Sequence, residues 1–123
     1  MSAATVQFFF NMRDQLKLHH WQTTSFARHK ATDQVIKELD ELIDSFVEVW
    51  VGGHYRPRVT ATTNEIKLRN LSEVAAVKFV KGCIAYVQGP LTKTLKPGDS
   101  ELANIRDEII AQLQQLLYLF TLK

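Results

Sequence analysis

Four side chains that could bind a metal ion follow one another along a single predicted helix, residues 26–51. They are His29, Asp33, Asp44 and Glu48, and at about 100° per residue they share one stripe of an α-helix. Imidazole nitrogens and carboxylate oxygens are ligands for iron, zinc and manganese in proteins. The stripe therefore predicts a metal site, and the alternative interpretation is a solvated helix face that makes ordinary intrahelical contacts.

The spacing along this helix divides the four side chains into two pairs. His29 and Asp33 lie one turn apart, as do Asp44 and Glu48, whereas about 16 Å of helix rise separates Asp33 from Asp44. Because metal–ligand bonds are only about 2 Å long, one ion cannot bind both pairs of one chain. We place a second copy antiparallel across the first on a two-fold axis. The His29–Asp33 pair of each chain then meets the Asp44–Glu48 pair of the other chain. We therefore expect a two-fold dimer with two shared sites.

Hydrophobic periodicity predicts three further helices around this one. The first spans residues 5–21, and His20 ends its apolar stripe. We expect His20 to be buried as a metal ligand or as a core histidine bonded to a backbone carbonyl. His19 is expected at the surface. Residues 23–25 supply hydroxyls that cap the next helix, and Gly52–Gly53 is expected to end that helix in the left-handed conformation.

The third helix is expected to start near residue 63 or 70, where two patterns resemble capping boxes, and to stop at Gly89–Pro90. The fourth spans about residues 101–121 and follows the turn Lys96-Pro-Gly-Asp-Ser. The second and third helices are joined by a longer link than the others. The sequence thus predicts an all-α chain, a four-helix bundle of the ferritin-like kind.

A set of residues in the first two helices resembles the mini-ferritins of the DNA-protection-during-starvation (Dps) family. The matching positions are His20-Trp21, Phe26, His29-x-x-x-Asp33 and Asp44-x-x-x-Glu48. The resemblance implies an inter-subunit ferroxidase centre, with His20, His29 and Asp33 from one subunit and Asp44 and Glu48 from its mate. It also implies iron storage in a dodecameric shell and a role in oxidative stress.

Two departures from the Dps pattern keep an alternative open, a metal-free ferritin-like dimer with a structural or protein-interaction role. The turn between Trp21 and Phe26 is shorter than in that family, and the chain itself is short. A di-iron centre inside one bundle is disfavoured, because such centres use Glu-x-x-His motifs. No histidine of this chain has a glutamate three residues before it.

Length and composition place the chain among single-domain proteins, with one domain over residues 1–123. A hydrophobic content of 46% is sufficient for a packed core.

The single cysteine, Cys83, excludes an internal disulfide and suits a reducing, cytoplasmic compartment; we expect it to be buried in the third helix. No signal peptide and no apolar run of about 20 residues is present, so no membrane span is expected.

The charge distribution argues against nucleic acid as a partner. The net charge is only +2, the first twelve residues contain no lysine or arginine, and the C-terminus contributes only Lys123. Without a basic arm, the attraction to phosphates is weak. The locally basic segment 56–69 is the remaining candidate for a partner-binding loop, and a solvated loop is its simpler interpretation.

Overall fold

The chain folds into helices and contains no β-strand. The computed structural model describes residues 1–123. Its elements in chain order are α1 (Ala3–Gln22), α2 (Phe26–Gly53), α3 (Glu73–Tyr86), the π-helical turn η1 (Val87–Leu91) and α4 (Ser100–Leu119). The predicted all-α class, with four helices, is confirmed.

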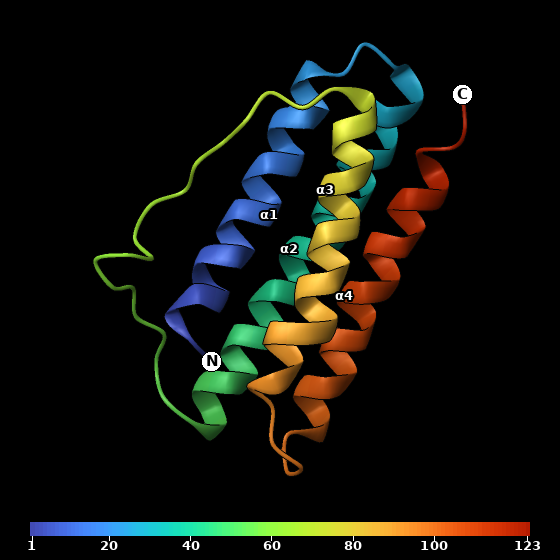
Figure 1. Ribbon diagram of the computed structural model, residues 1–123. Helices are drawn as coiled ribbons and strands as arrows, with labels where there is room; N and C mark the ends of the chain where they lie inside the picture. Colours follow the sequence, from blue (N-terminus) through green and yellow to red (C-terminus); the bar gives the residue numbers. More distant parts are fainter.

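The directions of the helices follow from the lengths of their connections (Figure 1). The short turn 23–25 makes α1 and α2 antiparallel. A long segment, residues 54–72, then leads from the end of α2 back along the bundle to the end where α2 began. We call this segment the strap. Because of the strap, α3 runs parallel to α2, and α4 runs antiparallel to both (Figure 1).

Serine side chains cap the starts of α2 and α3. The Ser25 hydroxyl accepts a hydrogen bond from the Arg28 N–H at 3.2 Å, as expected for the turn 23–25. The Ser72 hydroxyl accepts from the Ala75 N–H at 3.1 Å. The prediction that the third helix begins near residue 63 or 70 is therefore wrong, because the capping hydrogen bond forms at Ser72 and both positions lie in the strap.

The helix α2 ends at Gly53, where the glycine pair was expected to end it, but without the predicted left-handed conformation. Both glycines are helical, and no glycine in the chain has a positive φ. The chain leaves the helix at His54, whose ring stacks on Trp50 with centroids 4.1 Å apart and whose Nε2 lies 3.1 Å from Asp99 Oδ1. These contacts hold the chain where it leaves α2, and no residue there adopts the left-handed conformation.

Gly89–Pro90 does not stop the helix that it was expected to stop. The backbone passes through both residues in the wider turns of η1. Proline lacks an N–H and its ring clashes with the carbonyl four residues before it in an α-helix. A π-helical turn relieves this conflict locally, because it replaces the regular α-helical hydrogen bonds at that point.

The core lies between all four helices. The fully buried members on α2 and α4 include Val35, Leu39, Phe46, Leu102, Ile109, Leu113 and Leu116. Cys83 is 3% exposed on α3, so its predicted burial is confirmed. None of the helices combines the length and the apolar character that crossing a membrane requires.

The surface position predicted for His19 is wrong, because this residue is only 1% exposed. It continues the buried stripe of Met12 and Leu16 by one more turn of α1. Its ring packs edge-on against Phe120 at the end of α4, with centroids 5.9 Å apart. The end of α4 therefore buries His19, whose environment the sequence of the first helix alone does not determine.

Candidate functional site

The tight turn between α1 and α2 brings two of the predicted ligands, His20 and His29, into contact. The Thr23 N–H closes α1 by donating to the His19 carbonyl at 2.9 Å, and Ser25 caps α2 two residues later. The imidazole rings stack nearly parallel, with centroids 4.0 Å apart and an angle of 16° between their planes. The short turn is thus the element that assembles this part of the site.

Each of the two histidines bonds the backbone of the other. His20 Nδ1 donates to the His29 carbonyl at 2.8 Å, and His29 Nδ1 donates to the His20 carbonyl at 3.0 Å. A carbonyl oxygen can only accept, so Nδ1 carries the hydrogen in both rings. In the neutral imidazoles the lone pair therefore lies on Nε2, the atom that would bind a metal.

Burial favours the neutral, metal-binding form of His20. The residue is 6% exposed, and desolvation lowers the pKa of His20, although the hydrogen bond to the His29 carbonyl acts in the opposite direction. His20 Nε2 has no hydrogen-bond partner, yet it is not one of the fully buried atoms without partners, which belong to His19 and Trp50. His20 Nε2 therefore keeps some contact with solvent. His29 is exposed.

Thr32 is a member of this site that the sequence did not indicate. It is completely buried, its hydroxyl donates to the Arg28 carbonyl at 2.8 Å, and the same oxygen lies 2.9 Å from His20 Nδ1. The hydroxyl thus helps to fix the rotation of the His20 ring. Its position one turn after Arg28 was the available signal, since threonine often bonds back to that carbonyl in a helix.

Asp33 lies one turn beyond His29 and forms the ion pair expected of a solvated helix face. Its Oδ2 is 3.5 Å from Lys37 Nζ. Desolvation acts to raise the pKa of Asp33, but the charge and hydrogen bond of Lys37 outweigh it and lower the pKa below its usual value. The carboxylate is therefore ionised, and Lys37 is the group that a metal ion would have to displace.

The second predicted pair, Asp44 and Glu48, lies far along α2 from the histidines. Both residues are exposed and neither forms an ion pair or a hydrogen bond within the chain. Asp44 borders an open hollow of about 520 Å³ between α1 and α2, together with Phe10, Arg13 and Ile43. One chain does not bring three or more His, Cys, Asp or Glu side chains together in a metal-binding arrangement.

The arrangement therefore offers two incomplete sets of donors, one where α1 meets the start of α2 and one further along α2. The first set has two imidazole nitrogens of fixed tautomer beside an ionised carboxylate. The second set has two free carboxylates. Divalent transition metals bind such mixed nitrogen and oxygen donors, but each set alone leaves coordination positions to be filled by another molecule.

Comparison with known proteins gives a family and a relative. The model of DUF5856, a family of unknown function, matches residues 20–120. An uncharacterized 14.6 kDa protein in the mobD-ri intergenic region of Enterobacteria phage T4 is 52% identical over 33 residues, which span 27% of this chain and 26% of the phage protein. No solved structure matches the chain.

These findings overturn the assignment to the Dps mini-ferritins. The family match covers most of the chain, including every residue on which that assignment rested, and it is to DUF5856. The Dps pattern in this sequence consists of a few polar positions at helical spacing. Such positions also suit an ordinary solvated face, as the pair between Asp33 and Lys37 shows.

Proposed function

The chain belongs to DUF5856, a family of unknown function, and for it we propose an inter-subunit site for a divalent transition metal. Two chains would pair through α2 on a two-fold axis. His20, His29 and Asp33 of one subunit would share an ion with Asp44 and Glu48 of the other. Fe(II) is the proposed substrate, bound and oxidised at this site, and zinc or manganese are the other metals that the donors would accept.

One observation carries this proposal, the reciprocal hydrogen bonds of His20 and His29. Metal-binding histidines usually donate their second ring N–H to a carbonyl or carboxylate, which fixes the tautomer and the orientation of the ring. Here both rings have that arrangement, at 2.8 and 3.0 Å. The ionised Asp33 on the next turn adds the negative charge that a divalent ion needs.

The face of α2 supports the antiparallel pairing. The arrangement that brings His29 to Glu48 also brings Lys37 to Asp40, a favourable pair of charges. It places Asp33 opposite Asp44, and two like charges at an interface are costly unless a cation lies between them. At one end of the same face, Phe26 is 74% exposed, as is typical of an interaction surface.

The path of the chain supports the finer description of the fold as ferritin-like. Such bundles have one long crossover connection, and the strap between α2 and α3 is of that kind. Storage of oxidised iron would require a closed shell of dimers, such as a twelve-subunit one, and the mass of the protein in solution tests this. A reducing, cytoplasmic compartment would suit the unpaired Cys83.

The proposal is tested by adding Fe(II) in air and following the ferric absorbance. Wild-type protein should oxidise Fe(II) faster than buffer, and Asp44→Ala/Glu48→Ala should reduce the rate to that of buffer. A matched control is Asp107→Ala/Glu108→Ala, which removes two exposed carboxylates from α4 and should leave the rate unchanged. Equal rates for wild type and Asp44→Ala/Glu48→Ala would overturn the proposal.

A second candidate function is a metal-free dimer with a structural or protein-interaction role. It is favoured by the engagement of Asp33 with Lys37, which makes an ordinary ion pair of a helix surface. Metal analysis of protein purified without chelators separates the two candidates. Stoichiometric metal supports the shared site, and a dimer without metal supports the second candidate.

A further inference from the structure

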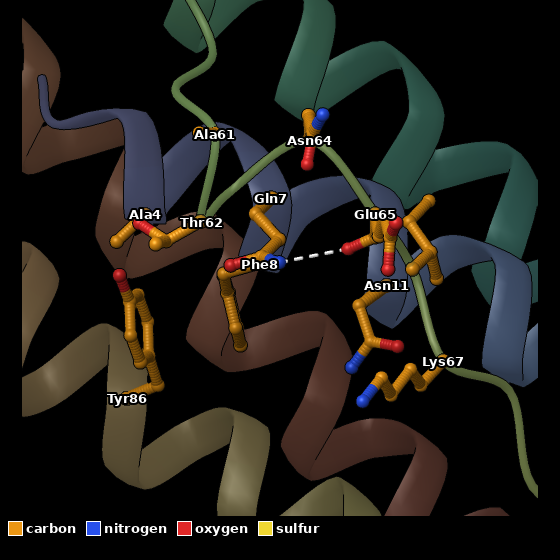
Figure 2. Close-up of a pocket in the computed structure, with 11 residues that line it drawn as sticks. Ala4, Gln7, Phe8, Asn11, Ala61, Thr62, Asn64, Glu65, Lys67 and Tyr86 are labelled. Atoms are coloured by element: carbon orange, nitrogen blue, oxygen red, sulfur yellow. Dashed lines mark hydrogen bonds between the residues drawn. The ribbon is translucent and has the colours of Figure 1, made fainter.

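A hollow of about 670 Å³ lies between α1, the end of α3 and the strap (Figure 2). Its lining combines three amide side chains with a hydroxyl, an ammonium group and an aromatic pair. These residues are Gln7, Asn11, Asn64, Thr62, Lys67, Phe8 and Tyr86. A hollow of this size and mixed lining is typical of a site for a small molecule.

Two glutamines of α1 hold the strap on either side of this hollow. Gln7 Nε2 donates to the Glu65 carbonyl at 2.7 Å (Figure 2). Two turns further along, the amide of Gln15 forms hydrogen bonds of 2.7 and 2.9 Å with the backbone of Arg69. Specific contacts between α1 and the strap thus form the walls of the hollow.

Asn11 lies midway between these glutamines, one turn from each, and its amide forms no hydrogen bond within the chain. It lines this hollow and also a second one of about 430 Å³. Phe8 and Tyr86 border both hollows, and their rings stack with centroids 4.0 Å apart. The two hollows therefore share an aromatic wall and an amide without a partner, and we call the two hollows together the groove.

The charges around this groove are mainly positive. Lys67 lines the first hollow, and Arg69 and Lys78 line the second. None of the three forms an ion pair. Glu65 is the one acidic residue in the lining of the two hollows. The groove therefore favours a ligand with negative charge.

We propose that this groove binds a small organic phosphate that carries a planar ring, of the nucleoside monophosphate class. The ring would pack against Phe8 and Tyr86, where aromatic surfaces favour flat partners. Its polar edge would bond the free amide of Asn11, and the positive charges of Lys67 in the first hollow and of Lys78 in the second would attract the phosphate. This site uses none of the residues of the proposed metal site, and its test is independent of that proposal.

The test uses metal-free full-length protein and three probes, AMP, adenosine and inorganic phosphate, in calorimetric and NMR titrations. AMP should bind more tightly than either adenosine or phosphate, and it should shift the NMR signals of the Asn11 side chain. Lys67→Gln/Lys78→Gln should weaken AMP binding about tenfold or more, the effect of losing charge-assisted hydrogen bonds. The same variant should leave adenosine binding unchanged.

The matched control is Lys93→Gln, which removes an exposed positive charge away from the groove and should leave AMP binding unchanged. The absence of any response to AMP at about 10 mM would overturn the proposal, because that covers the weakest useful affinities. Binding of phosphate as tight as that of AMP would also overturn it, since the ring would then contribute nothing. Equal AMP affinities for wild type and Lys67→Gln/Lys78→Gln would do the same.

Discussion

The side-chain amide of Gln15 pairs with the backbone of Arg69 as one strand of a β-sheet pairs with another. Gln15 Nε2 donates to the Arg69 carbonyl at 2.7 Å, and the Arg69 N–H donates to Gln15 Oε1 at 2.9 Å. Gln15 is 1% exposed, so its side of the pair is buried, whereas Arg69 is an exposed residue of the strap. A single buried side chain thus joins the middle of α1 to the strap.

We expect Gln15→Ala to lower the free energy of unfolding by about 2 kcal/mol, because it removes both hydrogen bonds between α1 and the backbone of Arg69. Urea denaturation measures this change. Hydrogen exchange at the Arg69 amide should also become faster, as the strap opens locally. Gln22→Ala is the matched control, since Gln22 bonds Asn70 at 2.7 Å in an exposed position; its effect should stay within about 0.5 kcal/mol. Equal effects of the two variants would contradict the anchoring role of Gln15.

Mixing two inactive variants tests whether the proposed metal site is shared between subunits. His20→Ala/His29→Ala removes one half of the site, and Asp44→Ala/Glu48→Ala removes the other. After the two are unfolded and refolded together, each mixed dimer regains one complete site. The Fe(II) oxidation rate should then recover to about a quarter of the wild-type rate, because random pairing makes half of the dimers mixed.

The control for this experiment mixes two variants with lesions in the same half, His20→Ala/His29→Ala and Asp33→Ala. No mixed dimer of that pair has a complete site, so no recovery is expected. Recovery in the control, or none in the first mixture, would show that ligands from two subunits do not share an ion.

The thiol of Cys83 should be unreactive in the folded protein. Burial raises the pKa of the Cys83 thiol to about 12, and the thiolate is the form that reacts. With a rise from the ordinary value of 9.0, an aromatic disulfide reagent should react about a thousandfold more slowly with native protein than with protein in urea. Cys83→Ala/Ala85→Cys moves the thiol to an exposed position on α3 and should react rapidly when folded. A native rate similar to that in urea would show that the helix opens readily at this point.

The sequence predicted the helices well, because their apolar periodicity is set by neighbouring residues. It failed where distant segments meet. Glutamine is usually a surface residue, and the strap, which bonds the Gln15 side chain, is far from it in the sequence. His19 shares the spacing of Met12 and Leu16, but its burial depends on Phe120 at the other end of the chain.

In the candidate site, too, local features of the sequence were predictable, whereas the relative orientation of the elements was not. The short turn 23–25 made contact between the first two helices predictable, and His20 does bond a backbone carbonyl, one of its two expected interpretations. The matching bond from His29 depends on the rotation of α2 relative to α1, which spacing alone does not fix. The pairing of Asp44 and Glu48 with these histidines involves a second molecule, so it stays a prediction.

The last prediction concerns acid and the contact between His54 and Asp99. Asp99 is 8% exposed. The backbone N–H of Lys96, at 2.9 Å, and then the His54 side chain lower the pKa of Asp99 below its usual value of 3.8. In the window between the folded and the unfolded pKa, the unfolded chain binds more protons than the folded one. The stability contributed by Asp99 is therefore present above the unfolded pKa and is lost as the pH falls through the folded pKa.

Asp99→Asn should lower the stability at neutral pH and flatten its decline between about pH 5 and pH 2, since an amide does not titrate there. The free energy of unfolding, measured by urea denaturation across that range, gives both quantities. Glu108→Gln is the control, because Glu108 is exposed and unpaired on α4, and its curve should run parallel to that of the wild type. If Asp99→Asn also runs parallel to the wild type, the bond from Lys96 does not stabilise the ionised carboxylate.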